Sequence, residues 1–518
     1  MNLGRYISRS ARFWPNENAL IYKNKRFTYR EFDIRTNCLA QGLLSLGLKP
    51  GDHVAVQSWN RSEIIEVEIA CYKAGLVKVP INARLSIGET IHVANDSETK
   101  AIILDARHAE DILDVRKDLP SIEHIICLEP APAHTLDYET LVGGSSRINP
   151  DMEVCEDDIA VLHYTSGSSG KLKAAIQTFG NRLAFLRKAM MVPDTHVNRG
   201  DIFSLVGPIT HATGMNIMPV LFAGGCNLVM DRFDPELLIE TISTEKVTHT
   251  FLVPTMINML LDNQKLQDCD LSSLKAVIYG ASPMSPNRVR QAMDVFGPIL
   301  VQGYGAGETT SLVTILTMQD HLEALHHNPE RLSSCGRPVF DTEVRVVDEN
   351  GQETAVGQIG EIIVSGPDIM KGYWNEPTLT REVLKDGWYH TGDLARVDDE
   401  GYIYIVDRKK EMIISGGFNV YPTEVESVLY DHPAVYEACV IGVPDDTWGE
   451  AIKAIVVIKE EKSVSEVELI EHCTKSLSSF KKPKSIHFVD DLPKNPNGKI
   501  VRRIVREKYW SGKKRFVQ

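Results

Sequence analysis

The sequence contains no long hydrophobic run, and none of its segments approaches the about 18 consecutive apolar residues of a membrane-spanning helix. Its N-terminal segment likewise lacks the apolar core of a secretory signal. Positive charge is also scarce, since 56 Lys and Arg stand against 70 Asp and Glu, for a net charge of −14. This balance excludes a protein that mainly binds nucleic acid, which needs a basic surface, but it is compatible with a small basic pocket for an anion.

The nine cysteines are odd in number and form no CxxC pair, so they indicate neither a disulfide framework nor a structural zinc site. We interpret them as buried thiols of a protein in the reducing cytosol. Internal repeats and low-complexity tracts are missing as well. With 43% hydrophobic and 24% charged residues, the composition is that of a globular protein.

The length of 518 residues predicts two or three domains, and helix and strand signals alternate along much of the chain. Helical patterns and short apolar runs follow one another at residues 27–46, 53–56, 62–75 and 77–80. Further apolar runs lie at residues 101–104, 246–252 and 275–278. This alternation predicts an α/β fold with a parallel sheet and crossover helices.

The pattern changes at about residue 340. Runs at residues 343–347, 360–364 and 401–406 predict strands, and the pair Asn350-Gly351 is typical of a hairpin turn. After the charged residues 407–410 comes a shorter stretch with α and β signals of its own. We therefore place a domain boundary near residue 407, although the same residues would also suit an ordinary surface turn.

Residues 164–173 combine hydroxyl, glycine and lysine residues directly after an apolar run. Glycines let backbone N–H groups approach an anion closely, hydroxyls donate to phosphate oxygens, and lysine adds a positive charge. The segment is not a Walker loop, because Thr165 stands where that loop has glycine and Leu172 where it has Ser or Thr. It predicts a phosphate-binding loop, but a flexible polar loop has the same composition.

Three further motifs offer groups for a nucleotide. Tyr304, between glycines, could stack on a base, and Glu308 could hold Mg²⁺ together with substrate phosphates. Asp393, after a tight turn, could accept hydrogen bonds from both ribose hydroxyls, and Lys499 could reach a polyphosphate from its loop of proline and glycine. Each motif alone also fits an ordinary feature, namely a glycine-rich turn, an Asp turn or a solvated lysine.

Taken together and in this order, the motifs resemble those of the adenylate-forming superfamily of acyl-CoA synthetases, luciferases and peptide-synthetase adenylation domains. The resemblance covers roughly residues 10–510, with further matching segments at residues 73–82, 208–214, 253–255, 279–283 and 413–422. It implies an α/β fold whose large N-terminal domain, residues 1–406, has parallel-sheet subdomains and a β-barrel-like subdomain. A small mobile α+β C-terminal domain, residues 407–518, would rotate about a hinge at Lys410.

The resemblance also implies a reaction in two steps. A carboxylic acid attacks the α-phosphate of ATP to give an acyl-adenylate and pyrophosphate, and the thiol of coenzyme A then displaces AMP. The leading interpretation is an acid–CoA ligase for a medium- or long-chain fatty acid or an aryl acid. An adenylating amide synthetase, a carrier-protein acyl loader or an ATP-binding regulator without turnover are the alternatives. A homodimer is expected only because dimers are the commonest assembly.

A role for each motif follows from the same resemblance. The residues that would handle the β- and γ-phosphates are Thr165, Ser166, Gly167, Ser168, Ser169, Gly170 and Lys173. Those that would bind the nucleoside are Gly280, Ala281, Ser282, Gly303, Tyr304, Gly305, Asp393 and Arg408. Glu308 would bind Mg²⁺, Lys499 would bridge the carboxylate and the α-phosphate, and His211 would gate the acyl pocket. After the domain rotates, Gly416 and Gly417 would help to form the thiol channel.

The acyl pocket would lie near His211, residues 279–281 and residues 303–310, with Tyr279 and Phe340 as bulky residues. No basic residue of these motifs offers a partner for a second substrate carboxylate, which disfavours dicarboxylic acids.

Two positions depart from the family pattern. The phosphate loop has Leu172 and Ala174 in place of the usual Pro and Gly around its last lysine, from which we expect an altered loop stiffness. Gly307 stands where many relatives carry a Thr whose hydroxyl contacts the α-phosphate. We expect either a slow first step or replacement of this donor by Thr309 or water. If the missing hydroxyl limits the first step, the substitution Gly307→Thr should speed pyrophosphate release, whereas no change or a fall would mean that the local structure already compensates.

Overall fold

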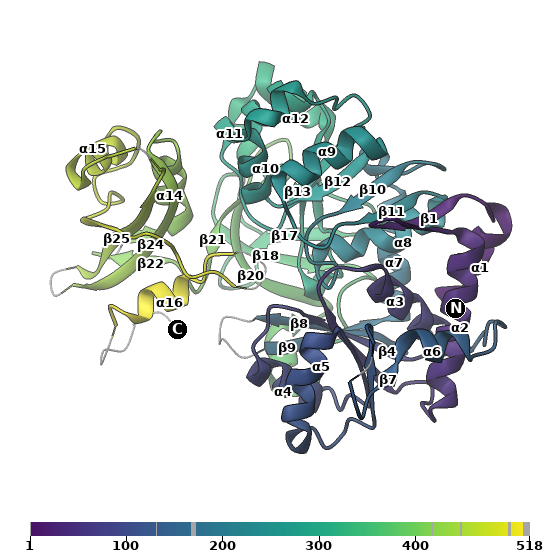
Figure 1. Cartoon of the computed structure of the whole chain (residues 1–518). Helices are drawn as coiled ribbons and strands as arrows, with labels where there is room; N and C mark the ends of the chain where they lie inside the picture. Colours follow the sequence, from purple (N-terminus) through teal and green to yellow (C-terminus); the bar gives the residue numbers. More distant parts are fainter. Residues whose placement is uncertain are drawn as a thin grey trace.

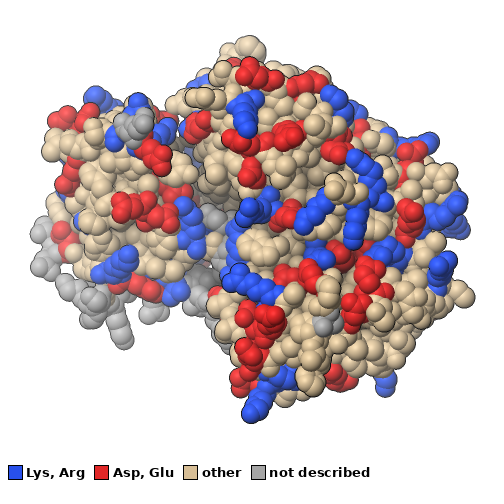
Figure 2. Space-filling view, viewed as in Figure 1, with Lys and Arg blue, Asp and Glu red and all other residues tan. Residues whose placement is uncertain are grey.

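A computed structural model describes residues 2–130, 132–166, 172–416, 418–445, 448–460, 462–495 and 499–510. The described strands form four sheets, two of them large and mainly parallel. In Figure 1 the last sheet and its helices form a small body beside the rest of the described chain. A hollow separates the two bodies on the face shown in Figure 2, where acidic and basic side chains intermingle.

The first large sheet has seven strands in the order β7-β6-β5-β3-β4-β8-β9. All its neighbours pair in parallel except β8 and β9, which form an antiparallel hairpin. Its strands are β3 (His53–Ser58), β4 (Val77–Asn82), β5 (Ala101–Leu104), β6 (His124–Cys127), β7 (Leu136–Asp137), β8 (Ile159–Ser166) and β9 (Leu172–Thr178). The helices of this region are α2 (Tyr29–Ser45), α3 (Ser62–Ala74), α4 (Ile87–Asp96), α5 (Ala106–Asp114) and α6 (Tyr138–Gly143).

The second large sheet has nine strands in the order β16-β15-β14-β13-β12-β10-β11-β1-β2. Its strands are β1 (Asn18–Tyr22), β2 (Lys25–Thr28), β10 (Ile202–Leu205), β11 (Cys226–Val229), β12 (His249–Leu252), β13 (Ala276–Gly280), β14 (Leu300–Tyr304), β15 (Thr314–Leu316) and β16 (Arg337–Pro338). The accompanying helices are α1 (Gly4–Phe13), α7 (Phe179–Met190), α8 (Ile217–Ala223), α9 (Pro235–Glu245), α10 (Pro254–Leu261), α11 (Pro286–Phe296) and α12 (Met318–His326). The central strands are parallel, and β2, β15 and β16 pair antiparallel at the two edges.

One hydrophobic core joins the two large sheets. Helix α3 is buried along its whole length, and its apolar side chains belong to a cluster that includes residues of β3, β5, β10 and α7. Because α3 meets protein on every side, its apolar residues are not confined to one stripe. The parallel α/β architecture predicted from the alternation of signals is confirmed.

The expected barrel-like subdomain is a five-stranded antiparallel sheet, and its described strand pairs do not close into a ring. Its elements are β17 (Glu343–Val347), β18 (Gly360–Ser365), α13 (Pro377–Val383), β19 (Leu384–Lys385), β20 (Trp388–Val397) and β21 (Ile403–Arg408). The Asn350-Gly351 turn is present, but it leads only to a single bridge between Val347 and Glu353. Strand β18, the partner of β17, begins further along the chain at Gly360.

The C-terminal sheet has the order β23-β22-β25-β24, with β26 beside β25. Its elements are β22 (Ile413–Ser415), β23 (Phe418–Val420), α14 (Pro422–Tyr430), β24 (Val435–Asp445), β25 (Gly449–Ile458), α15 (Glu466–Ser476), β26 (Ser485–Phe488) and α16 (Arg502–Glu507). Its apolar core contains residues of β22 to β26 together with α14 and α15. This core is separate from the clusters of the large sheets, which is the property expected of an independent folding unit.

The structure bears on two expectations from composition. Among the described helices, none is both long enough and apolar enough to cross a membrane. All nine cysteines are free, but they are not all buried, because Cys155 is exposed and Cys269 is half-buried.

Candidate active site

The sequence motifs meet where β13 and β14 end, beside the β8–β9 hairpin and the β20–β21 pair. Carboxyl ends of parallel strands are the usual place for ligand sites in open α/β sheets. Tyr304 ends β14, and Glu308 follows in a short 3-10 helix, Gly307–Thr309. The described site therefore draws on three of the four sheets.

One side of the site is built around the Asp393 carboxylate. The Tyr304 hydroxyl donates a hydrogen bond of 2.7 Å to Oδ2 of Asp393, and the Arg408 Nε lies 3.1 Å from Oδ1. Asp393 and Arg408 are direct partners in the register of β20 and β21, so strand pairing itself brings the two charges together. Burial, and then the Asp393 charge, raise the pKa of Tyr304 far above its ordinary value, so its hydroxyl remains a donor.

The glycines of this side allow two strands and a loop to approach closely. Gly280 and Gly303 are partners in the register of β13 and β14, and a Cβ on Gly280 would lie 2.2 Å from the Gly303 oxygen. A Cβ on Gly305 would lie 1.2 Å from the Ser311 oxygen. Ala281 adopts a positive φ of 67°, an uncommon conformation for a residue with a side chain, and the next residue, Ser282, is half-buried.

The opposite side of the site is built around the Glu308 carboxylate, which is 8% exposed. Its Oε1 accepts hydrogen bonds from the hydroxyls of Thr165, at 3.2 Å, and Tyr373, at 2.8 Å. Lys173, the partner of Thr165 in the β8–β9 register, holds its Nζ 3.8 Å from the centre of the Tyr373 ring. Burial lowers the pKa of Lys173, and the charge of Glu308 opposes that shift.

Part of the predicted phosphate loop lies outside the described residues. This applies to Gly167, Ser168, Ser169 and Gly170, and to the side chain of Ser166. The described ends of the loop, Thr165 and Lys173, both contact the Glu308–Tyr373 pair.

The donor set around Glu308 suits Mg²⁺ better than a metal that needs an all-protein cage. Mg²⁺ is usually held by one or two carboxylates plus substrate phosphates and water. In the described part of the chain no group of three or more His, Cys, Asp or Glu side chains could hold a metal ion. A single buried carboxylate next to a phosphate-type loop fits the first arrangement.

Lys499 follows the C-terminal sheet in the chain, and its amino group interacts electrostatically with charged residues of this site. The residue is exposed at the surface, but desolvation by the surrounding protein lowers the pKa of its amino group to about 8. The positive charges of Arg408 and Arg502 lower this pKa as well. Asp393 and Glu411 oppose the shift. The amino group is thus within electrostatic range of the Asp393–Arg408 pair, which comes from a different sheet.

The remaining C-terminal residues are placed differently. Lys410 follows β21, and its charge contributes to lowering the pKa of Lys173. Gly416, in the turn between β22 and β23, has a φ of 58° and donates its N–H to the Trp448 oxygen at 2.8 Å. None of its described contacts reaches the Tyr304–Glu308 cluster, and Gly417 lies outside the described residues.

His211 is accompanied by a second histidine that the sequence motifs did not single out. The rings of His211 and His163 lie 5.6 Å apart at an interplanar angle of 73°, and Nδ1 of His211 is 3.0 Å from the Thr210 hydroxyl. Burial, followed by the charges of neighbouring groups, lowers the pKa of His211 to about 3 and that of His163 to about 4. Both rings are therefore neutral near pH 7.

The gap left by Gly307 is filled by His163. A Cβ on Gly307 would lie 2.5 Å from Cδ2 and 3.1 Å from Nε2 of that ring. A threonine at position 307 would have to displace this imidazole, so the geometry argues against faster pyrophosphate release by Gly307→Thr in the native background. Thr309 cannot supply the donor either, since it is buried and its hydroxyl is bonded within the Ala306–Ser311 turn.

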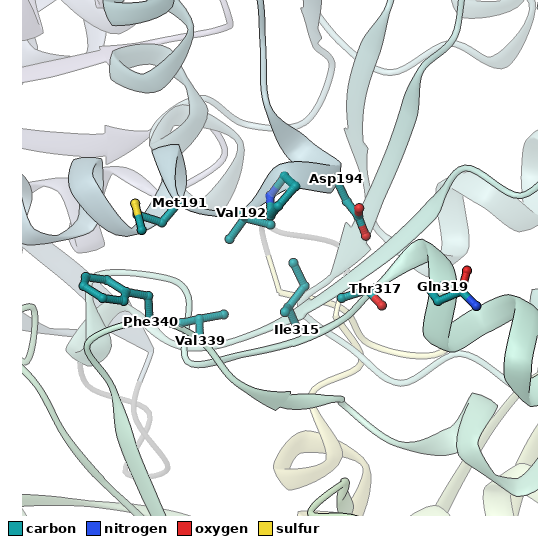
Figure 3. Close-up of a pocket in the computed structure, with 9 residues that line it drawn as sticks. Met191, Val192, Asp194, Ile315, Thr317, Gln319, Val339 and Phe340 are labelled. Carbon is teal, nitrogen blue, oxygen red and sulfur yellow. The ribbon is translucent and has the colours of Figure 1, made fainter.

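The two bulky residues expected in the acyl pocket do not line an opening beside His211. Tyr279 is 1% exposed, and its hydroxyl lies 2.9 Å from Nε2 of His321. Phe340 faces a pocket of about 340 Å³ elsewhere, shown in Figure 3. That pocket is lined by Met191, Val192, Pro193, Asp194, Ile315, Thr317, Gln319, Val339 and Phe340, and it contains none of the predicted catalytic or nucleotide-binding residues.

Sequence reasoning missed two polar residues of the site, His163 and Tyr373. His163 had a usable signal, because residues two apart on a strand share a face and it stands two residues before Thr165. Tyr373 had none, since it lies outside every motif and reaches Glu308 only through the fold.

Comparison with known proteins identifies the family of the chain. The family model described as AMP-binding enzyme matches residues 7–374, and the AMP-binding enzyme C-terminal domain matches residues 424–499. A feruloyl-CoA synthase of Amycolatopsis is 38% identical over 509 residues, covering 98% of this chain and 99% of the relative. A medium/long-chain-fatty-acid–CoA ligase of Mycobacterium tuberculosis is 35% identical over 517 residues, covering 97% of this chain and 89% of the relative. The solved amide bond synthetase McbA of Marinactinospora thermotolerans is 27% identical, with a TM-score of 0.88 and coverage of 98% and 100%.

Proposed function

The chain belongs to the AMP-binding enzyme family, and from this membership we propose that it is an ATP-dependent acid–CoA ligase. It would activate a carboxylic acid as acyl-AMP, release pyrophosphate and transfer the acyl group to the thiol of coenzyme A. The ligase activities named for the feruloyl and fatty-acyl relatives support an aryl or a medium- to long-chain fatty acid as substrate.

The observation that carries this proposal is the meeting of Asp393, Glu308 and Lys499. These residues come from three separate regions of the sequence. In the fold Glu308 accepts a hydrogen bond from Thr165, Asp393 pairs with Arg408, and Lys499 interacts electrostatically with Arg408. An ordinary surface pocket would not need these three groups together. A nucleotide, with a ribose, a chain of phosphates and a bound cation, needs all three groups.

Asp393 would accept the ribose hydroxyls, with Arg408 and Tyr304 holding its carboxylate in place. Adenine would lie beside Tyr304, with the closely paired Gly280 and Gly303 and the neighbouring Ala281, Ser282 and Gly305 forming that wall. On the other side, the described ends of the phosphate loop, Thr165 and Lys173, would face the β- and γ-phosphates.

Glu308 would hold Mg²⁺, which neutralises phosphate charge when it is bound. The protein's own contribution is to fix this carboxylate through Thr165 and Tyr373, so that its orientation exists before the substrate arrives.

Lys499 would place a cation between the substrate carboxylate and the α-phosphate. Two anions must approach each other in this step, and a fixed positive charge lowers the cost of that approach. His211, a neutral ring at the same end of the site, would border the entrance for the acid.

We assign residues 1–406 to the adenylation domain and residues 407–518 to a lid that turns about Lys410. The separate hydrophobic core of the C-terminal sheet supports this division. In the present arrangement Lys499 lies near the nucleotide side and Gly416 does not, as expected for an enzyme poised for its first step. After rotation, Gly416 and Gly417 would line the thiol channel.

The test is pyrophosphate release with Mg-ATP across fatty, aryl and heteroaryl acids, each with and without coenzyme A. We expect release that rises with coenzyme A and yields AMP and an acyl thioester. No release with any acid would overturn the proposal in favour of a nucleotide-binding regulator.

A second candidate is an adenylating amide synthetase, and the structural similarity to the amide bond synthetase McbA favours keeping it. Carrier-protein loading is a related alternative. Acyl-adenylate that ignores coenzyme A but is consumed by amines or by a carrier protein would support one of these activities instead. The nine free thiols are in keeping with a cytosolic enzyme.

The activity should also depend on pH through Lys499. Its pKa of about 8 means that it is charged below this pH and loses its proton as the pH rises. Since adenylation needs the cation, kcat/KM for ATP, which reports the free enzyme, should fall above about pH 8. The variant Lys499→Arg should carry this limb to higher pH because guanidinium stays charged. A wild-type profile without a fall between roughly pH 8 and pH 9.5 would contradict the role of the Lys499 charge.

A further inference from the structure

His163 and Gly307 face each other at the middle of the proposed nucleotide site. His163 lies on β8, and its Nε2 would be 3.1 Å from a Cβ on Gly307. The same Cβ would be 3.0 Å from Cγ2 of Thr165, which is on the same face of β8. Tyr164, which lies between His163 and Thr165 in the strand, points to the other face and donates a hydrogen bond from its hydroxyl to Asp96. The ring of His163 therefore lies beside the backbone that joins Tyr304 to Glu308.

The connectivity of a nucleotide fixes what must lie at this point. Tyr304 and Asp393 form the nucleoside side of the site, and Thr165 and Glu308 form the polyphosphate side. In ATP the α-phosphate joins the ribose to the β- and γ-phosphates, so it has to pass between these two sides. Gly305 to Gly307 is the segment that links them. This step rests on the proposed function, since it takes ATP to be the ligand.

His163 has hydrogen-bonding capacity to spare. Among the described residues its ring contacts His211 edge to face, and its two nitrogens make no hydrogen bond. The ring is half-buried rather than enclosed. A neutral imidazole offers one N–H donor and one acceptor. The ring is kept neutral by burial and by the charges of Arg182 and Lys78, which are themselves paired with the buried Glu68.

The surroundings hold this arrangement in place. Arg182 donates to Glu68 at 2.7 Å and to the Tyr72 hydroxyl at 3.0 Å. Gln177, on the neighbouring strand β9, donates to the Gly307 oxygen at 2.9 Å. The backbone at 307 is thus held by Gln177 before any substrate binds, and the His163 ring packs edge to face against His211. Groups positioned in advance are the condition for a useful transition-state donor.

We propose that the His163 imidazole donates a hydrogen bond to the α-phosphate of ATP, from the space that a side chain at position 307 would otherwise fill. His163 and Gly307 then form a matched pair. The ring has room only because Gly307 has no Cβ, and the ring supplies the donor that a side chain at position 307 does not provide. The amide of a glutamine at 163 could reach the same space, whereas a methionine of similar length carries no donor.

The test compares His163→Met with His163→Gln, using AMP and adenosine as probes in calorimetry and pyrophosphate release as the rate. We expect His163→Met to weaken AMP binding about 10-fold, to leave adenosine binding within about 2-fold, and to lower kcat of pyrophosphate release about 10²-fold. His163→Gln should keep most of both. The difference between AMP and adenosine isolates the phosphate, which a merely structural defect would not do.

A second experiment uses the proposed pairing directly. Gly307→Thr alone should lower the rate because it collides with the ring, and His163→Ala alone should lower it because the donor is lost. The double variant, in which the threonine hydroxyl can enter the vacated space, should be at least 10-fold faster than His163→Ala. A double variant no faster than that single variant would overturn the pairing.

Equal weakening of AMP and adenosine by His163→Met, or no weakening, would overturn the proposal for His163 itself. Failure of the proposed function would look different, because the wild-type protein would then release no pyrophosphate with any acid. The comparison of AMP with adenosine still decides the role of the ring in that case.

Discussion

Replacing Lys499 with alanine should lower the rate of pyrophosphate release by about 10³-fold, while a supplied acyl-adenylate is still converted to its thioester. The Lys499 charge acts in the first step only, where the acid and the α-phosphate meet as two anions. In the second step a thiol attacks an acyl-adenylate that already exists. Separate assays of the two steps, one started with acid and ATP and the other with acyl-adenylate and coenzyme A, measure the difference.

Lys494→Ala is the matched control for this substitution. Lys494 is a lysine of the same segment, but it is paired with Glu437 at 2.9 Å and Asp491 at 3.0 Å, on its own side of the molecule. The Lys494→Ala variant should release pyrophosphate within about 3-fold of the wild-type rate, as expected for the loss of a partly exposed ion pair. Equal loss of both steps in Lys499→Ala would contradict a lysine that serves adenylation alone.

Much of the fold could be predicted because its signals are local. The helix that begins at Tyr29 is capped by Thr28 and Glu31, which satisfy each other's backbone donors, and the buried strand from His53 follows it as the apolar run indicated. The order of the motifs along the chain also indicated which residues share a site. Asp393 and Arg408, predicted at one ribose, are paired by strand register in the fold.

The misses come from contacts that join distant segments. Tyr279, on strand β13, appeared available for a pocket, but its hydroxyl is engaged by His321 of helix α12, and nothing in the neighbouring sequence reveals this. Tyr373 reaches Glu308 from 65 residues away. The meaning of Gly307 was missed for the same reason, because a glycine looks like a lost donor until the ring of His163, over 140 positions earlier, is seen to fill its space.

Glu308 offers a sharper distinction, since its two roles require different properties of the side chain. As a hydrogen-bond acceptor for Thr165 and Tyr373 it needs only an oxygen, which glutamine also has. As the ligand of Mg²⁺ it needs a negative charge, which glutamine lacks. Glu308→Gln should therefore keep the fold and lower pyrophosphate release by about 10³-fold, with a higher Mg²⁺ concentration needed for half-maximal rate.

Tyr373→Phe separates the two roles from the other direction, because it removes one hydrogen bond from the carboxylate and leaves its charge. We expect a loss of about 10- to 150-fold, smaller than that of Glu308→Gln, and little change in the Mg²⁺ dependence, since a single hydrogen bond to a charged group contributes about 1.5–3 kcal/mol and Thr165 still holds Oε1. If Glu308→Gln were nearly as active as the wild type at the same Mg²⁺ concentration, the carboxylate would be an anchor for the loop rather than a cation ligand. If Tyr373→Phe were as damaging as Glu308→Gln, the orientation of the carboxylate would matter as much as its charge. The first step would then depend on the contacts that β8, the 307–309 turn and Tyr373 make with one another.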